Sequence, residues 1–455
     1  MIVVEEKLPK HPDTRILERF DDGTGENIHP VLDRVRATAL KDFKRLGIPA
    51  GKNERYRYTD VGKILDRPFV PLLHPHRRTF KVEEIFRCDI PTLDTLAFTV
   101  LNGFFFEEQE TLVELPGGVL VGGLRQALKQ VPQLAEAYLD KLSNTVNDGL
   151  VALNRAMATD GFFMYVPDGM VMDKPVQLVN LLKDDEDIMT QHRSLVILGK
   201  NAQAALLICD HALSEQKFIS HGLMEVFVGE NSAMEITKLQ NEHNSMTDLS
   251  SLFIRQERNS RVRTNTISLH GGLIRNNLHV SLQGEGAENQ AYGLFLIDRQ
   301  QHVDNSVFID HAAPHCFSNQ LYKGVLDDEA TGAFDGKILV RPYAQKTEAF
   351  QVNKNILLTD HAKMKTKPQL EIYADDVKCT HGATVGQLDE EALFYLRSRG
   401  IHEYEARMLL MYAFAHEVIR EIKIDPLQDR IHELVDKRLR GELPRCHTCL
   451  VDYNK

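Results

Sequence analysis

The middle of the chain, from about residue 160 to residue 387, consists mainly of short runs in which apolar and polar residues alternate. This alternation is typical of β-strands, and the helical spacing of apolar residues is almost absent there. The runs start roughly every 10 to 16 residues, and Gly, Asn or Asp separates many of them. The predicted strands cover Pro175–Leu182, Arg193–Leu198, Ala204–Cys209, Met224–Val228, Met234–Leu239, Ser251–Glu257, Arg261–Leu269, Leu273–Leu282, Ala291–Ile297, Ser306–Asp310, Gln320–Leu326, Ala333–Val340, Ala349–Leu358 and Gln369–Tyr373.

More than 200 residues of this pattern exceed what one β-sandwich uses, because a sandwich is complete after about 100 residues. A propeller would repeat a four-stranded blade every ~40 residues, and the sequence has no such signature. The strands also follow one another too closely for the helices of βαβ units. A β-solenoid needs only small residues at its corners and apolar residues pointing inward, so the pattern favours a solenoid.

Helices are predicted on both sides of this zone. Before it, the clearest helix covers Ile28–Gly47, with Pro30 near its start and Pro49 just beyond its end, and a second helical stretch runs from Gly123 to Leu142. After it, three amphipathic helices follow Asp389, His402 and the Asp425-Pro426 pair. These last helices would either cap the end of the solenoid or form a docking module, and their apolar faces do not decide between the two.

The pattern therefore divides the chain into four parts. We expect an N-terminal helical region at residues 1–150, a β-solenoid core at 151–387, a C-terminal helical domain at 388–445 and a tail at 446–455. At 455 residues the chain is too long for one ordinary compact core, which agrees with a repeat architecture.

Charge and hydropathy limit the kind of partner. The net charge is −11, which argues against phosphate-backbone binding, so no nucleic acid is expected. The longest apolar runs fall far short of the ~20 residues that span a bilayer, and the N-terminus has no secretory pattern. We expect a cytoplasmic protein without a membrane partner, in which the six cysteines are core residues, metal ligands or reactive thiols rather than disulfides.

The sharpest candidate site is Cys379 with His381, where the last strands meet the C-terminal helices. In an extended backbone, residues two apart project from the same face, so both side chains could reach one ion. A thiolate with an imidazole suits iron, zinc or copper(I). Two ligands do not fill a tetrahedral shell, and we therefore expect a site that a second chain or a transient ligand completes. The alternative is a buried cysteine beside a hydrogen-bonded histidine.

Three further groups are weaker candidates. They are Cys209 with His211, the group His302, His311, His315 and Cys316, and the tail pair Cys446 and Cys449. The first cysteine closes an apolar run and is more typical of a core residue, and the second group shows no fixed ligand spacing. The tail pair forms a lone C-x-x-C that would bind metal or act as a redox pair.

Common enzyme motifs are missing. The sequence contains no G-x-x-x-x-G-K-[ST] phosphate loop, no G-x-S-x-G elbow and no H-E-x-x-H helix. We expect no enzyme activity in the chain itself and no ATP bound through a loop of its own. A polysaccharide lyase on the same fold would need a cleft of carboxylates and basic residues, which the sequence does not suggest.

Specific segments resemble a known family. Residues 379–401, which read CTHGATVGQLDEEALFYLRSRGI, are similar to the C-terminal signature of the SufB/SufD family of the SUF iron–sulfur cluster assembly system. The Gly382–Gly386 wording favours the SufD branch over the SufB branch. Residues 54–60 resemble the family's E-x-W-x-Y-T element, with Tyr56 in the Trp position, and Asn102-Gly103 and Gly332–Asn355 also fit.

The resemblance implies a mainly β fold, a right-handed parallel β-helix flanked by N-terminal and C-terminal helical regions. It implies a non-catalytic scaffold subunit of the SufBCD complex that forms a heterodimer with SufB. The ATPase SufC would dock on the C-terminal helices, on which we single out Leu393, Phe394, Leu409 and Phe414. Cys379 and His381 correspond to the family's metal-associated pair at the SufB interface, which would hold iron or a nascent cluster.

The resemblance implies no cofactor stably bound to the isolated subunit. It implies iron or an iron–sulfur cluster only transiently, in the complex, and it leaves room for FAD there. Two alternatives stay open. The chain is either a SufB-like paralogue scaffold, or a purely structural β-helix dimerisation module without a metal role. In isolation, without SufB, the chain is open to forming a homodimer.

Overall fold

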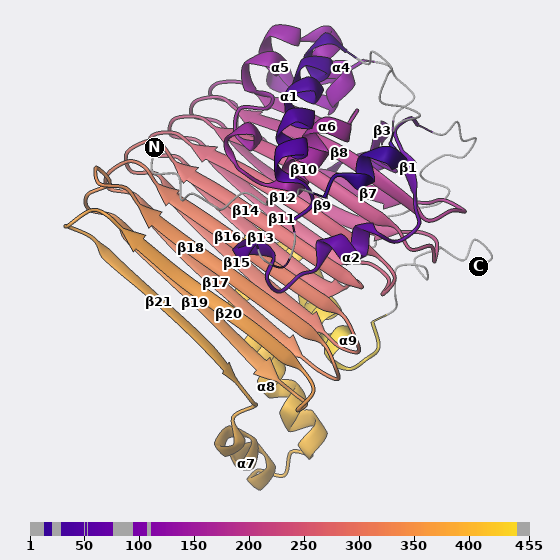
Figure 1. Cartoon of the computed structure of the whole chain (residues 1–455). Coiled ribbons are helices and arrows are strands. Elements are labelled where there is room, and N and C mark those ends of the chain that lie inside the picture. Colours follow the sequence, from indigo (N-terminus) through magenta and orange to yellow (C-terminus); the bar gives the residue numbers. More distant parts are fainter. Residues whose placement is uncertain are drawn as a thin grey trace.

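The computed structural model describes residues 13–20, 29–49, 51, 53–75, 94–106 and 111–443. These residues form a parallel β-solenoid of about eight turns with helices on its outside (Figure 1). Successive strands alternate between two sheets, so each turn adds one strand to each sheet. The mainly β fold and the flanking helices predicted from the sequence are confirmed.

The strands and helices have the following bounds. In spatial order, the first sheet contains β20 (Lys363–Ile372), β18 (Thr331–Val340), β16 (His302–His311), β14 (Leu273–Leu282), β12 (Thr247–Gln256), β10 (Ile219–Val228), β8 (Ile188–Leu198), β6 (Phe162–Val166), β5 (Val119–Gly123) and β4 (Val113–Leu115), and β1 (Val70–Leu72) pairs with β8. The second contains β21 (Lys378–Gly386), β19 (Glu348–Leu357), β17 (Phe317–Leu326), β15 (Glu288–Ile297), β13 (Arg261–His270), β11 (Ala233–Asn241), β9 (Gln203–Ala212), β7 (Val176–Leu182), β2 (Leu96–Leu101) and β3 (Phe104–Phe106). The α-helices are α1 (Pro30–Leu46), α2 (Val61–Leu65), α4 (Leu124–Gln130), α5 (Pro132–Tyr138), α6 (Gly149–Met157), α7 (Glu390–Ser398), α8 (Glu403–Ile419) and α9 (Asp425–Leu439).

The strand pattern of the middle zone agrees closely with the structure, because every strand predicted there overlaps an observed one. Neighbouring turns are in parallel register: Thr247 pairs with Leu273, 26 residues later, and Thr331 pairs with Lys363, 32 residues later. The predicted strands did not include β6 and β21, which lie inside the predicted solenoid zone. They also did not include the short strands β1 to β5, which lie before that zone, where only helices and loops were expected. Pairing with the first turns of the solenoid explains β2 and β5, since runs this short show little periodicity of their own.

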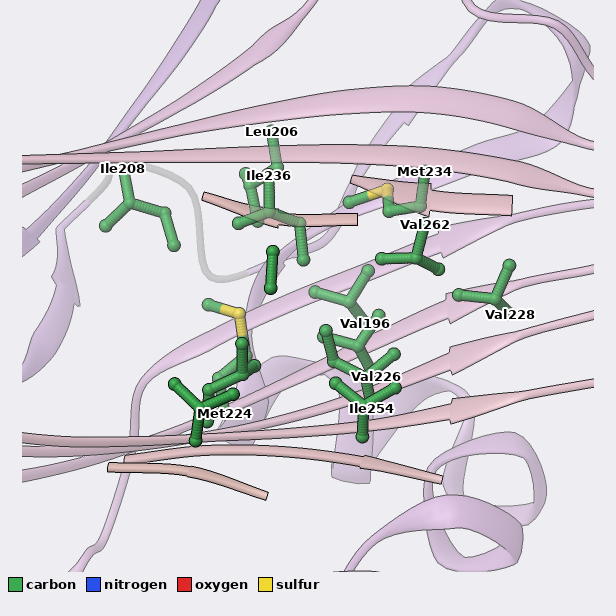
Figure 2. Packing of buried hydrophobic residues seen from close by; sticks show 14 of the residues in the cluster. Val196, Leu206, Ile208, Met224, Val226, Val228, Met234, Ile236, Ile254 and Val262 are labelled. Atoms are coloured by element: carbon green, nitrogen blue, oxygen red, sulfur yellow. The ribbon is translucent and has the colours of Figure 1, made fainter. Parts of the chain in front are cut away.

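Apolar side chains fill the space between the two sheets. Val226 and Ile254 of the first sheet face Leu206 and Ile236 of the second (Figure 2). Each of these side chains is at most 1% exposed. This apolar half of the interior is what alternation in the sequence predicts.

Asparagine shapes one corner of the solenoid. Asn201, Asn231 and Asn259 have φ values of 54°, 58° and 53°, a left-handed conformation that asparagine tolerates better than most residues. Their side chains also stack from turn to turn, since the amide nitrogen of Asn231 donates to Oδ1 of Asn201 at 3.3 Å and that of Asn259 donates to Oδ1 of Asn231 at 3.2 Å. The repeated corner keeps successive turns in register.

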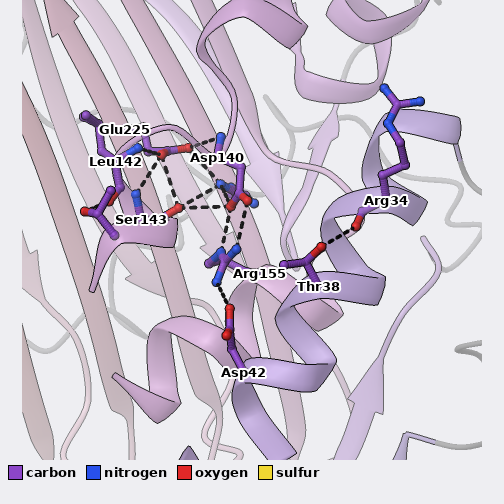
Figure 3. Close-up of polar contacts among 10 residues, drawn as sticks. Arg34, Thr38, Asp42, Asp140, Leu142, Ser143, Arg155 and Glu225 are labelled. Atoms are coloured by element: carbon purple, nitrogen blue, oxygen red, sulfur yellow. Dashed lines mark hydrogen bonds and ion pairs between the residues drawn. The ribbon is translucent and has the colours of Figure 1, made fainter. Parts of the chain in front are cut away.

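A buried ion network attaches the N-terminal helices to the first sheet (Figure 3). Arg193 of β8 bonds to Asp140 and Glu225, both at 2.8 Å, and Arg155 of α6 joins Asp140 to Asp42 of α1 at 2.7 and 3.0 Å. Burial alone would raise the pKa of Asp140, but its bonds to the two arginines hold that pKa below its usual value. The network therefore fixes α1 and α6 on the outside of the sheet.

The helices α8 and α9 do not cover the end of the solenoid, as an end cap would. The apolar residues Met411 and Val418 of α8 and Ile431 of α9 are buried in one cluster with Ile267 and Leu294 of the second sheet. Helices α8 and α9 thus cover the outer face of that sheet, while α7 projects beyond the last strands (Figure 1). Of the two arrangements left open by the sequence, the end cap is excluded for these helices.

Candidate functional site

The last turn of the solenoid presents two strand edges of different character. Among the described residues, β20 pairs only with β18 and β21 only with β19. The β20 edge carries Lys363, Lys365, Lys367 and Pro368, residues that discourage the addition of another strand. From Thr380 to Gly386, β21 has no lysine, proline or carboxylate. Its edge is therefore open to pairing.

Cys379 and His381 lie on this open strand. Cys379 pairs with Ala349 of β19, and His381 pairs with Gln351. Ala349 and Gln351 are fully buried, and the Gln351 amide nitrogen donates to Gln320 at 2.9 Å. Since paired residues on neighbouring parallel strands project to the same face, Cys379 and His381 both face the interior of the solenoid. They occupy the outermost interior layer.

The two side chains are covered to different degrees. Cys379 is half-buried beside the apolar cluster that includes Ile338 and Ala374, and His381 is exposed. Burial raises the pKa of the Cys379 thiol, and a hydrogen bond from the backbone of Ala349 opposes this only in part. The thiol is therefore protonated at neutral pH, and a metal ion would have to displace that proton in order to bind.

The pair alone does not form a complete metal site. No group of three or more His, Cys, Asp or Glu side chains in the described part of the chain is placed to hold one metal ion. A tetrahedral shell needs four donors, and Cys379 with His381 supply two. Any metal bound there would need further ligands from another molecule.

The other cysteine and histidine candidates do not combine into sites. Cys209 is buried against the C-terminal helices, and its sulfur accepts a hydrogen bond from Gln177 at 3.6 Å. Burial lowers the pKa of His211 to about 4, so this histidine is neutral. Both residues are therefore part of the packing of the fold and do not form a metal site.

The group around residues 302 to 316 is also dispersed. Each of three members has its own local partner: His302 bonds to Thr331 at 2.6 Å, His311 to Ser318 at 2.8 Å, and Cys316 to the carbonyl of Gly284 at 3.3 Å. His315 lies on the surface. Cys446 and Cys449, like Cys88, lie outside the described residues, so their predicted role stays a prediction.

The residues singled out on the C-terminal helices fall into two groups. Phe394 of α7 is 74% exposed and Leu409 of α8 is 49% exposed, and Leu393 is half-buried. A shallow groove beside them is lined by Asp389, Glu390, Glu391, Ala392, Phe394, Tyr395, Leu396 and Leu410. Phe414 instead faces the sheet, where the Lys323 ammonium lies 4.1 Å from its ring centroid.

The E-x-Y-x-Y-T segment is a structural attachment. Tyr56 is 1% exposed, and its hydroxyl donates to Asp148 at 2.7 Å while the Arg275 guanidinium lies 4.1 Å from its ring. Thr59 bonds to Asp304 of β16 and to His302 at 2.9 Å. The segment binds residues 53–61 to the outside of the first sheet, from Arg275 of β14 to Lys367 of β20, which pairs with Glu54 at 2.5 Å.

Comparison with known proteins agrees with this architecture. The family model described as SUF system FeS cluster assembly, SufBD core domain, matches residues 181–414, and the one described as SufBD protein N-terminal region matches residues 16–178. The chain belongs to the SufBD family. Its members act in iron–sulfur cluster assembly by the SUF system, and this SufBD chain is a component of that kind.

Individual relatives point the same way. The chain is 32% identical over 418 residues to a SufBD family protein of Synechocystis, covering 90% of this chain and 91% of that protein. It is 28% identical to the iron–sulfur cluster assembly protein SufD of Escherichia coli, covering 88% and 92%, and 24% identical to SufD of Bacillus subtilis, covering 71% and 74%. No helix in the described ranges is long and apolar enough to cross a membrane.

Proposed function

We propose that this SufBD chain is a non-catalytic scaffold subunit that binds a SufB-type partner at the open end of its solenoid. The observation that supports this most directly is the position of Cys379 and His381. Both occupy interior positions that a further turn would cover, and within the described residues no such turn follows. A partner that adds a strand to β21 would cover them in its place.

The cargo of such an interface would be iron or a nascent iron–sulfur cluster. Cys379 supplies a thiolate once its proton is displaced, and His381 supplies an imidazole, which are the donor types that iron takes in proteins. A partner thiolate would complete the shell. Because each subunit holds only part of the shell, separation of the two would release the cargo.

The C-terminal helices offer a surface for the ATPase of the system, a SufC-type protein. Phe394 and Leu409 form its exposed apolar part, and Asp389 and Glu390 lie on the rim of the groove. Only residues 387–389 connect β21 to α7. Movement of an ATPase bound to α7 would therefore act directly on the strand that carries Cys379.

The test is cluster assembly on the complex. The chain is produced with its SufB-type and SufC-type partners, purified without oxygen, and assayed for iron and acid-labile sulfide per complex. We expect Cys379→Ala and His381→Ala each to lower the cluster content while the complex still forms. Thr380→Ala is the matched control, because Thr380 lies between them and projects from the opposite face of β21.

Two outcomes would contradict the proposal. Unchanged cluster content in both variants would remove the metal role and leave a structural module. Purification of the chain as a stable homodimer that excludes the SufB-type partner would overturn the heterodimeric arrangement. FAD in the assembled complex and the lack of a stably bound cofactor in the isolated chain stay predictions.

A further inference from the structure

One half of the solenoid interior is polar, in contrast to the apolar half. A cavity of about 80 Å³ lies between the sheets, and its polar lining includes His192, Asp210, Lys238, Asp248 and Asn276. A cavity of this size has room for several water molecules. Polar inward-facing residues recur from turn to turn, since Ser250 pairs with Asn276, which in turn pairs with Asn305.

Carboxyl groups outnumber lysine and arginine side chains in this region. Lys238 of β11 contacts Asp248 at 2.9 Å and Asp210 at 3.2 Å. Glu242, which follows β11 and is 1% exposed, adds a third carboxyl group. Lys238 is the only lysine or arginine among the described residues that line this cavity and its smaller neighbour. Burial lowers the pKa of His192 to about 4, so this imidazole adds no positive charge.

A second cavity of about 10 Å³ shares Asn180, His192, Asp210 and Ser220 with the first, and Glu242 lines only the second. We call it the oxygen void; its polar lining residues are Asn180, His192, Asp210, Ser220 and Glu242, and all of these except His192 carry a side-chain oxygen. Its volume corresponds to one water-sized particle. Oδ1 of Asn180 and Oε2 of Glu242 have no hydrogen-bond partner among the described residues. A buried acceptor without a partner is destabilising, so an occupant that satisfies both oxygens would be stabilising.

We propose that the oxygen void binds one small monovalent cation of the size of Na⁺ or K⁺. Its oxygen donors are of the hard type that such ions prefer, and the surplus of carboxyl groups favours a positive occupant. Only two carboxyl groups line the void, which is fewer than an all-protein calcium site commonly uses. Burial and the nearby Asp248 and Asp210 raise the pKa of Glu242, so a cation bound there would displace the proton of that carboxyl group.

The geometry also explains one glycine of β10. A Cβ atom at Gly222 would lie 2.4 Å from Nε2 of His192. Glycine at this position therefore leaves space for the imidazole that forms one wall of both cavities. The small residue at position 222 therefore allows a polar side chain to line the cavities where apolar side chains would otherwise fill the space.

The test uses the full chain without partners. Its thermal unfolding is followed at constant ionic strength in choline chloride, with NaCl, KCl or RbCl replacing choline stepwise. We expect a saturable rise in Tm, on the order of 2 °C, with at least one alkali ion but not with choline. Crystals soaked in RbCl should show an anomalous peak between β7, β9 and β10 at the oxygen void.

Variants locate the effect. Glu242→Gln should abolish the ion-specific rise in Tm, whereas Glu215→Gln, which changes an exposed carboxylate, should preserve it. Should Glu242→Gln fail to fold, Ser220→Ala removes one oxygen of the void and should weaken the response. Equal Tm values in choline and in all three alkali salts, or a rubidium peak elsewhere only, would overturn the proposal.

Discussion

Arg438 of α9 is a polar anchor of the C-terminal helices, and its replacement by methionine tests how they are held. The side chain is 8% exposed. Its guanidinium donates to the carbonyl of Leu269 at 2.7 Å, to the carboxylate of Asp298 at 2.8 Å and to the carbonyl of Leu296 at 3.2 Å. Methionine keeps much of the apolar stem and removes all of these bonds.

The expected loss of stability depends on whether water can bond to each acceptor that Arg438 no longer reaches. A hydrogen bond from a charged donor contributes ~1.5–3 kcal/mol, but bonds from one guanidinium are not independent. The Asp298 side chain is 28% exposed, so water can solvate it once Arg438 is gone, whereas Leu269 and Leu296 are buried. We therefore expect a cost of about 3 kcal/mol, at the lower end of the ~3–5 kcal/mol for breaking a buried ion pair. Arg438→Lys keeps the charge without the fork and should cost about 1–2 kcal/mol.

Hydrogen exchange measures this cost locally. If the helices exchange by detaching from the sheet, 3 kcal/mol makes the amides of α8 and α9 exchange roughly 100-fold faster. The solenoid strands should keep their protection, because contacts between turns are unchanged. Arg440→Met is the control, since Asp436 and Glu405 bind Arg440 on the surface. Exchange in Arg438→Met equal to that in Arg440→Met would refute the anchoring role.

Two further predictions concern acid stability and the docking surface. Burial lowers the pKa of six described histidines to about 3 or 4; they are His192, His211, His221, His270, His279 and His311. Because the unfolded chain takes up these protons near pH 6.5 and the folded chain does not, their contribution to stability is full above pH 6.5. Between pH 6.5 and pH 5, each histidine's contribution to the free energy of unfolding falls by about 2 kcal/mol. Urea unfolding at pH 7 and pH 5 tests this, and equal midpoints at the two pH values would contradict the prediction. Phe394→Ala should leave thermal unfolding unchanged and weaken binding of a SufC-type ATPase roughly tenfold. Tyr373, which is 48% exposed on the solenoid, provides the control, because Tyr373→Ala should change neither property. Undiminished binding by Phe394→Ala would exclude Phe394 from that interface.

The solenoid was predictable because its pattern is long and local. Alternation identifies a strand without knowledge of its neighbours, and turns of similar length repeat the evidence many times. The placement of α8 and α9 was not predicted, although one signal existed. Leu294, Phe295, Leu296 and Ile297 of β15 are apolar at consecutive positions, which is typical of a strand covered on both faces. The inner residues meet the opposite sheet and the outer ones meet the helices.

The candidate site was predictable in part. Spacing alone places Cys379 and His381 on one face of a strand. Their exposure arises because no described strand follows β21 in its sheet, which sequence spacing does not show. The interior charges were missed because inward positions were expected to be apolar. Lys238 is nevertheless in phase with Met234 and Ile236 of the same strand, both of which are buried in the core. A lysine in that phase is a recognisable sign of a polar interior, since it requires buried carboxylates such as Asp210.

The two polar groups inside the solenoid differ in what can complete them, and the register explains why. Lys238 has a strand on each side, β9 and β13, so its partners come from adjoining turns of the same chain and any remaining oxygens can only be satisfied by something small. Among the described residues, His381 has a strand on one side only, and its side chain is exposed. A second subunit can reach the other side, but it cannot reach the middle of the stack. In a solenoid, a polar inward residue with a turn on each side can therefore be completed only by a small ion or molecule. A polar inward residue with a turn on one side can be completed by a second subunit.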